Sequence, residues 1–501
     1  MNLFVVGGSA DALRALASFF PGREVVEMGR LAWIAHDDGY VRPDGRAFFS
    51  GRPIVWRGDV ADGRAPLDPS FWLDPPVDDL DGRYVGVRMA GDEVTVFADA
   101  LGAYPVYRSG QAVSNNAYAL RGSDAGLRLD VLASLLGGGW SLSGDPVWQD
   151  VERIQPERPE PAPDESFDPD RAASLLTAAV RALADWPNRP DFIPVTGGRD
   201  SRLVLAAALA AGIDFETTTG GEPGHPDVEI GRDLARVAGV PWRLIEHDPH
   251  GSVESDWRRA AELLWLTSSG TASLSDAAGF PFGPRPGPLP LWHSGQGGEI
   301  ARAYYGSGTG TDDLYLRFVG RRPGRREILG EEGERLVREQ IEAFAADAPA
   351  GDLGDLFYLH RRMGTWAGPT HGAVELVRDT TSPLWSRRLL PDMLAAQSGE
   401  FHRQVLERLA PQLAEVPYER PRTPPRKLAD ELLRRVRPKP DPFDRILPEI
   451  RDAVLSQPQH AAWHVLDRAR VEELLGAKAG ALDTMSRYYA WRLATVFGPS
   501  A

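Results

Sequence analysis

A glycine-rich turn near the middle of the chain has the composition of a phosphate-binding loop. Residues 192–195 are apolar and indicate a strand, residues 203–211 indicate a helix, and the turn joins them. Such a turn presents backbone N–H groups, and the N-terminus of the following helix adds partial positive charge. We therefore predict that phosphate binds to Val195, Thr196, Gly197, Gly198, Arg199, Asp200 and Ser201.

The side chains of this turn suit a nucleoside triphosphate. Thr196 and Ser201 can donate hydroxyl hydrogen bonds to phosphate oxygens, and Asp200 can hold the Mg²⁺ that accompanies ATP. Gly197 and Gly198 are expected to allow close backbone approach and positive φ. The alternative is an ordinary strand-to-helix turn in which Asp200 or Ser201 caps the helix.

The turn resembles the SGGxDS pyrophosphate loop of the ATP-pyrophosphatase superfamily, and the surrounding segments resemble asparagine synthetase B, β-lactam synthetase and lasso-peptide cyclases. Residues 217–227 are similar to the strand and helix start on the adenine side of that family's site, and residues 234–241 match its next helix. The resemblance implies that Thr219 and Gly220 also contact the nucleotide.

A second glycine-rich segment, residues 292–300, resembles the SGEGSDE turn of the same family. The resemblance implies nucleotide contacts from Ser294 and Gly295, and a metal site in which Glu299 joins Asp200. Glu299 stands in place of the usual Asp. Two further positions depart from the family pattern, because Gln296 replaces a catalytic Glu of asparagine synthetases and Ile300 replaces another acid. These departures argue against the asparagine-forming reaction.

The N-terminal part of the chain has the pattern of an antiparallel sheet. Short alternating runs such as 84–89 and 93–98 are separated by turn residues, here Gly91-Asp92. Segments 81–86 and 97–107 resemble the amidotransferase-type domain of the family, including its D-x-x-G-x-x-P-[VL]-Y signature. Glutamine-dependent members carry a nucleophilic cysteine at position 2, where this chain has Asn2, and the chain contains no cysteine at all. Glutamine hydrolysis by that route is therefore excluded.

The predicted fold class is α/β with two domains. Residues 1–155 are expected to form a degenerate, Ntn-hydrolase-like α+β sandwich, and the proline-rich, charged residues 156–170 a linker. Residues 171–501 are expected to form an α/β ATP-pyrophosphatase domain, of the adenine nucleotide alpha hydrolase-like kind, with helical additions. A βαβαβ alternation after residue 192 indicates its mostly parallel sheet, and the chain beyond residue 251 is expected to be mainly helical.

Two further catalytic residues follow from the resemblance alone. Family members use a glutamate as the base that accepts a proton from the attacking amine, and Glu375 is our candidate; a plain surface carboxylate is the alternative. A lysine that offsets charge on the adenylate and the pyrophosphate corresponds to Lys439, with Lys427 as the competing choice and a solvated loop lysine as the alternative reading.

Composition limits the partners. The formal net charge of −15 argues against a nucleic-acid or anionic-membrane partner, and the absence of eighteen-residue apolar runs predicts a cytoplasmic, soluble protein. Arginines within residues 321–326 form the one basic cluster, which could receive an acidic partner but is more simply a solvated loop. His225 and His293 lack zinc-site spacing, and supporting or capping roles are expected. Trp366, Tyr304 and Tyr305 could line a pocket or belong to the core.

The function predicted from these features is an ATP-dependent, AMP-forming amide synthetase of natural-product biosynthesis, with ATP and Mg²⁺. Its partner would be a small molecule or peptide that carries a carboxylate and an amine, with a precursor peptide or leader-processing protein as a further partner. Ring closure, as in lasso-peptide or β-lactam formation, and intermolecular ligation both remain open. The alternatives are a catalytically altered ATP-binding partner protein and an ammonia-dependent asparagine synthetase-like enzyme.

Overall fold

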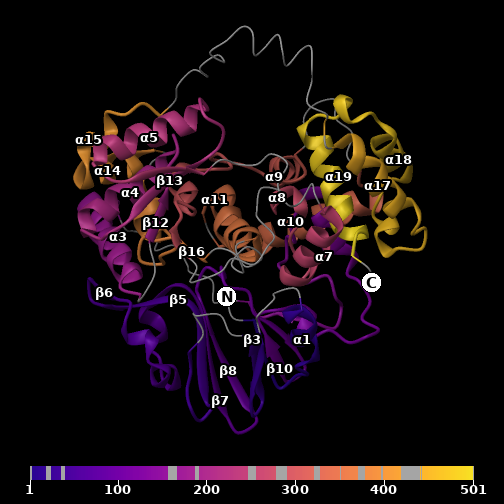
Figure 1. The fold of residues 1–501 in the computed structure, drawn as a ribbon, viewed down its shortest axis with the longest axis horizontal. Coiled ribbons are helices and arrows are strands. Elements are labelled where there is room, and N and C mark those ends of the chain that lie inside the picture. Colours follow the sequence, from indigo (N-terminus) through magenta and orange to yellow (C-terminus); the bar gives the residue numbers. More distant parts are fainter. Residues whose placement is uncertain are drawn as a thin grey trace.

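The computed structural model describes residues 3–18, 24–34, 40–155, 166–186, 191–245, 256–277, 290–320, 328–349, 351–370, 379–396, 399–418, 441 and 443–499. Within them, two antiparallel sheets from the N-terminal part lie below a parallel sheet and a group of helices (Figure 1). The mixed α/β class predicted from the sequence is confirmed. Among the described residues, none of the helices combines the length and the apolar character that crossing a bilayer requires.

The first antiparallel sheet has the strand order β11-β9-β10-β1-β3-β2, and the second has the order β4-β5-β7-β8, with β6 paired to β5. Their strands are β1 (Leu3–Val6), β2 (Val25–Met28), β3 (Leu31–Ile34), β4 (Tyr40–Val41), β5 (Ala47–Arg57), β6 (Val60–Asp62), β7 (Leu80–Ala90), β8 (Glu93–Ala98), β9 (Tyr107–Ser109), β10 (Ala112–Ser114) and β11 (Glu152–Arg153). The predicted hairpin is confirmed: β7 pairs with β8 around Gly91, whose φ is 62°.

The alternating residues of β7 explain how the second sheet is buried on both faces. Val85 and Val87 belong to the main core shared with the first sheet, whereas Leu80 and Tyr84 belong to a smaller cluster around Trp72. Because successive side chains of a strand point to opposite faces, one strand supplies two cores. Helices α1 (Asp11–Ala17) and α2 (Leu129–Gly138) and the short turns η1 (Ala65–Leu67), η2 (Pro69–Leu73), η3 (Val77–Asp79) and η4 (Ala117–Ala119) complete this part.

The parallel sheet has the order β14-β13-β12-β15-β16, and each neighbouring pair is parallel. The strands are β12 (Asp191–Pro194), β13 (Glu216–Gly220), β14 (Trp242–Ile245), β15 (Leu291–His293) and β16 (Asp379–Thr381), and the first three are joined through α4 (Arg199–Ala211) and α5 (Pro226–Ala238). These elements confirm the predicted βαβαβ order. Helix α3 (Pro169–Ala184) begins after Asp168, whose side chain caps it.

Strands β15 and β16 were not predicted, because the sequence beyond residue 251 was expected to be mainly helical. Each is only three residues long, so a hydrophobic period could not reveal it. The helical elements are α7 (Trp257–Thr267), α8 (Leu274–Ala277), η5 (Gly298–Arg302), α9 (Thr311–Phe318), α10 (Glu331–Asp347), α11 (Leu353–Phe357), the π-helical η6 (Tyr358–Ala367), α13 (Leu390–Ala395), α14 (Glu400–Leu409), α15 (Pro411–Ala414), α17 (Phe443–Leu455), η7 (Ala461–His464), α18 (Arg468–Gly476), η8 (Ala479–Ala481) and α19 (Thr484–Phe497). These helices agree with the mainly helical character expected beyond residue 251.

Buried polar groups join the antiparallel sheets to the parallel-sheet part. Asp81 on β7 accepts a hydrogen bond from Trp56 within its own sheet and also from the backbone N–H of Arg387, at 3.0 Å each. Arg52 on β5 forms a buried ion pair with Asp379 on β16. Removing one member of such a pair leaves an uncompensated buried charge, so the two parts are held as one structure.

We call these buried polar contacts between the two parts the polar seam. Two arginines of the N-terminal part extend the polar seam to η6 and the residue after it. Arg83 donates to the carbonyls of Ala103 and Gly368, and Arg153 donates to the carbonyl of Gly364 at 3.0 Å. Burial lowers the pKa of both guanidinium groups, although both remain charged at neutral pH because an arginine starts from so high a value. Arg83 and Asp81 therefore both contribute to the contact between the two parts.

Candidate functional site

The two glycine-rich motifs lie at the carboxyl ends of adjacent strands. The chain leaves β12 toward β13 on one side, whereas β15 pairs with β12 on the other side. The point where strand order reverses leaves a crevice beyond the strand ends, which is where open α/β sheets bind their ligands. Residues 195–201 follow β12 and residues 294–299 follow β15, so both motifs lie at this reversal of strand order.

Internal hydrogen bonds fix the first motif. The backbone N–H of Thr196 donates to Ser201 Oγ at 3.3 Å, and that of Gly198 donates to Thr196 Oγ1 at 3.1 Å. The N–H of Gly197 donates to Asp227 Oδ1 at 2.9 Å. The loop is therefore preformed, and it leads into the first turn of α4, where N–H groups have no intrahelical acceptor.

The structure corrects the reason for the two glycines. Neither Gly197 nor Gly198 has positive φ, contrary to the sequence-based expectation. A Cβ on Gly197 would lie 2.6 Å from the carbonyl oxygen of Tyr418, so glycine is needed there for close packing. Gly198 is exposed and occupies the N-cap of α4, where no side chain makes a capping hydrogen bond. The alternative in which Asp200 or Ser201 caps this helix is therefore not what the structure shows.

The second motif packs directly against the first. A Cβ on Gly295 would lie 2.6 Å from Ser201 N, and a Cβ on Gly298 would lie 2.7 Å from Asp200 Cγ. Ser294 is anchored to β16, because its N–H donates to the carbonyl of Thr381 at 2.7 Å. The glycines of the second motif thus let it approach the start of α4 closely enough for Asp200 and Glu299 to share partners.

Asp200 and Glu299 are linked through one guanidinium group. Arg302 Nη2 lies 2.8 Å from Asp200 Oδ2 and 3.5 Å from Glu299 Oε1. His402 Nε2 lies 2.6 Å from Asp200 Oδ1, on the other oxygen of that carboxylate. The structure therefore brings together the two residues predicted as metal ligands, and a positive charge already lies between them.

Tyr358 completes this cluster from the π-helical segment η6. Its hydroxyl donates to Glu299 Oε2 at 2.8 Å, and the backbone N–H of Gly297 donates to the same oxygen at 3.1 Å. Burial and the neighbouring carboxylate of Glu299 raise the pKa of the Tyr358 phenol, so the phenol remains a hydrogen-bond donor. Both contacts fix the Glu299 carboxylate in place.

The residues suit a magnesium–nucleotide complex in their chemistry. Mg²⁺ is usually held by one or two carboxylates together with substrate phosphates, and Asp200 and Glu299 supply two carboxylates beside the predicted phosphate loop. Within the described ranges, no three or more His, Asp or Glu side chains are arranged as a metal site by themselves. An ion bound between these two carboxylates would take the position of the Arg302 guanidinium, which would have to move aside.

The predicted adenine-side residues lie at the end of β13. The Thr219 hydroxyl is buried, donates to the carbonyl of Val195 at 2.8 Å and accepts from Trp242 Nε1 at 3.0 Å. Thr219 therefore supports the start of the predicted phosphate loop, which follows β12. Gly220 is exposed at the same strand end, and its backbone contact with a nucleotide stays a prediction.

The histidines near the motifs take supporting places. His225 caps α5, where its side chain accepts from the N–H of Asp227 at 3.2 Å. His293 Nε2 lies 2.7 Å from Asp191 Oδ1, joining β15 to β12. Other predicted residues, namely Glu375, Lys439, Lys427 and 321–326, lie outside the described residues.

Three members of the cluster were missed from the sequence: Arg302, Tyr358 and His402. Arg302 carried a usable signal, because it follows Glu299 by three residues and a helical turn places such neighbours together. Tyr358 and His402 had no comparable signal, since they reach the site from separate elements, η6 and α14.

Comparisons with known proteins add no assignment. No protein-family model matches the chain, and a search of curated proteins finds no significant match.

Proposed function

We propose that this protein is an ATP-dependent, AMP-forming amide synthetase, with a degenerate amidotransferase-like domain followed by an ATP-pyrophosphatase-like domain. The observation that carries the proposal is the close packing of two glycine-rich motifs at the reversal point of a parallel sheet, where Asp200 and Glu299 both contact Arg302. This position and these residue types suit a nucleotide polyphosphate.

In the proposed reaction, the start of α4 binds the β- and γ-phosphates through its first-turn N–H groups. Arg199 is exposed at the same turn and offers a guanidinium group to the same phosphates. Thr196 and Ser201, whose hydroxyl oxygens are 3.3 Å apart, orient the loop and can donate to a phosphate oxygen. These groups stabilise the negative charge that develops on the departing pyrophosphate.

The bonds change in two steps. A substrate carboxylate oxygen attacks the α-phosphorus of ATP, and the bond from that phosphorus to the pyrophosphate oxygen breaks, which leaves an acyl-adenylate. An amine then attacks the acyl carbon, AMP leaves and the amine proton passes to a base, for which Glu375 is the candidate. Asp200 and Glu299 would hold a bound Mg²⁺, which offsets phosphate charge, and Lys439 is the candidate for a second positive charge.

A substrate amine other than glutamine-derived ammonia follows from the absence of cysteine. The proposed partner is a small molecule or peptide with a carboxylate and an amine, as in ring closure or ligation in natural-product biosynthesis. The resemblance that suggests these chemistries is the one stated from the sequence.

One observation favours a second candidate, a catalytically altered ATP-binding protein. Arg302 lies where a divalent cation between the two carboxylates would be, 2.8 Å from Asp200. If that ion pair persists with nucleotide bound, the protein would hold ATP without transferring its adenylyl group.

Pyrophosphate exchange separates the two candidates. The protein is incubated with ATP, Mg²⁺, labelled pyrophosphate and a pool of organic acids and peptides, and label entering ATP is measured. The synthetase proposal expects exchange that Asp200→Ala abolishes, whereas Asp444→Ala, at an exposed carboxylate in the first turn of α17, should retain it. ATP binding without exchange would favour the second candidate, and full exchange by Asp200→Ala would refute the metal assignment.

A further inference from the structure

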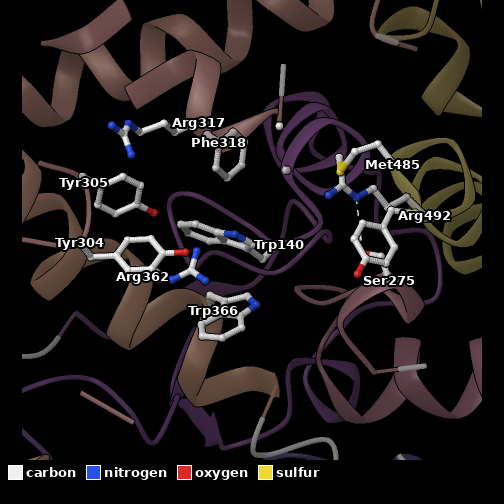
Figure 2. Close-up of a pocket in the computed structure, with 13 residues that line it drawn as sticks. Trp140, Ser275, Tyr304, Tyr305, Arg317, Phe318, Arg362, Trp366, Met485 and Arg492 are labelled. Atoms are coloured by element: carbon white, nitrogen blue, oxygen red, sulfur yellow. Dashed lines mark hydrogen bonds between the residues drawn. The ribbon is translucent and has the colours of Figure 1, made fainter. Parts of the chain in front are cut away.

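A cavity of about 390 Å³ lies among α2, α9, η6 and α19, beside the proposed site. This volume is within the range of small-molecule pockets, about 300–1,000 Å³. Figure 2 shows Phe318, Trp140, Trp366 and Tyr304 gathered on one side of the view, with Met485 and Arg492 on the other side. The lining residues are Gly138, Trp140, Ser275, Tyr304, Tyr305, Arg317, Phe318, Gly320, Arg362, Trp366, Met485, Tyr488 and Arg492.

The charge of this lining is opposite to that of the whole protein. Three arginines and no acidic residue are found among the described residues that line the cavity, although the chain has a net charge of −15. Arg492 has a structural task, because it donates to the carbonyl of Gly137 at the end of α2. Arg317 and Arg362 make no ion pair with a carboxylate in the part of the chain that the structure describes. The cavity therefore favours a negatively charged occupant.

Arg362 is the residue of the cavity that best indicates which chemical group would bind there. Its guanidinium carbon lies 4.2 Å from the centroid of the Trp366 ring and 4.8 Å from that of Tyr304 (Figure 2). Its Nε is buried and has no hydrogen-bond partner among the described residues. A guanidinium group removed from water is costly unless an anion accepts from it, and planar stacking prepares it for a carboxylate.

The cavity shares a wall with the proposed reaction site. The ring centroids of Tyr304 and Tyr358 are 5.3 Å apart, and the Tyr358 hydroxyl donates to Glu299. Tyr358, Arg362 and Trp366 are spaced four residues apart on η6, a π-helical segment, and such widened turns are frequent at functional sites. An occupant of the cavity would thus be separated from Glu299 by the rings of Tyr304 and Tyr358.

We propose that this cavity binds a ring-bearing organic acid, with its carboxylate on Arg362 and its ring against Trp366 and Trp140. This acid would be the substrate of the proposed synthetase. Its binding to the cavity requires no ATP, and only its later adenylation rests on the proposed function. The carboxylate on Arg362 is an anchor, and a second carboxyl group of the same molecule would be the one that reacts.

Calorimetric titration without ATP tests the binding. The probes are 1-naphthaleneacetate and its uncharged counterpart 1-naphthaleneacetamide, which share a ring and differ in charge. We expect the acid to bind roughly 10- to 100-fold more tightly than the amide, as the loss of a hydrogen bond to a charged group implies. Equal affinities would overturn the proposal.

Variants locate the site. Arg362→Gln should weaken the acid roughly 10- to 100-fold and leave the amide nearly unchanged, whereas Trp366→Leu should weaken both probes. Arg361→Gln is the matched control: it removes the same charge from the next residue of η6, whose guanidinium packs on Phe344 outside the cavity lining, and it should bind both probes as the unaltered protein does. Unaltered acid binding by Arg362→Gln would refute the assignment. If that variant does not fold, Arg362→Met keeps the apolar stem without the charge, and it should likewise weaken the acid and leave the amide nearly unchanged.

The two proposals fail separately. Selective acid binding without pyrophosphate exchange by any dicarboxylic aromatic acid would leave the cavity assigned and the synthetase function refuted. Pyrophosphate exchange that Arg362→Gln leaves unchanged would support the synthetase function and refute the cavity as the binding site of the acid.

Discussion

Substituting Gly298 by alanine should expose how tightly the two motifs depend on one another. A Cβ at this position would lie 2.7 Å from Asp200 Cγ and closer still to Asp200 Oδ1. Gly298 does not have positive φ, so alanine brings no backbone penalty there and the effect is purely steric. The Asp200 carboxylate must therefore move away from its partners.

The magnitude follows from what Asp200 would lose. Its carboxylate accepts from Arg302 at 2.8 Å and hydrogen-bonds His402 at 2.6 Å, and its side chain is only 13% exposed. Hydrogen bonds to charged groups contribute about 1.5–3 kcal/mol each, and overpacking typically costs about 1–3 kcal/mol. Because the carboxylate can shift rather than lose both bonds entirely, we expect Gly298→Ala to lower the free energy of unfolding by about 2–4 kcal/mol.

A double-mutant cycle in urea measures this coupling. Gly298→Ala is made in the unaltered protein and in Asp200→Ala, where the nearest clashing atoms are absent, and Gly310→Ala is the control because a Cβ there meets nothing within 4 Å. The penalty should be at least about 1 kcal/mol smaller in the Asp200→Ala background. An equal penalty in both backgrounds would show that Gly298 does not act through Asp200.

Three further predictions concern single residues. Arg302→Met leaves the Asp200 and Glu299 carboxylates without their shared cation, so in metal-free buffer the melting temperature should fall, and excess MgCl2 should raise it more than in the unaltered protein; an equal response to MgCl2 would contradict a cation site there. Glu375→Gln should let adenylate accumulate and slow amide formation about 10²-fold or more in single-turnover experiments, and unchanged amide formation would remove Glu375 as the base. Burial raises the pKa of Asp99 to about 6, so the folded state binds more protons than the unfolded state between about pH 4 and 6. Relative to Asp99→Asn, the free energy of unfolding should therefore fall by about 3 kcal/mol as pH rises through that interval, as measured by chemical denaturation at several pH values; a difference independent of pH would contradict the raised pKa.

The sequence was informative where local pattern and local structure coincide. The strand, glycine turn and helix around residues 192–211 were predicted because an apolar run, two glycines and a helical period follow one another without interruption. The hairpin of β7 and β8 was predicted for the same reason, since Gly91 interrupts two alternating runs.

The rest depended on contacts between distant segments. His402 reaches Asp200 across 202 positions of sequence, and nothing near either residue indicates the pairing. The positive φ expected at Gly197 was wrong because the constraint comes from the carbonyl of Tyr418, which a local pattern cannot contain. Likewise, β15 and β16 acquire strand geometry only by pairing with one another and with β12.

The polar seam between the antiparallel sheets and the parallel-sheet part has a practical consequence for expression of fragments. A truncated protein that starts near residue 166 would lose Arg52 and Asp81, exposing Asp379 without its ion-pair partner and the N–H of Arg387 without its acceptor. It would also uncover the backbone carbonyls of Gly364 on η6 and of Gly368 directly after it, and η6 carries Tyr358 and Arg362. The N-terminal sheets would in this way supply buried polar partners that the remaining chain needs in order to fold.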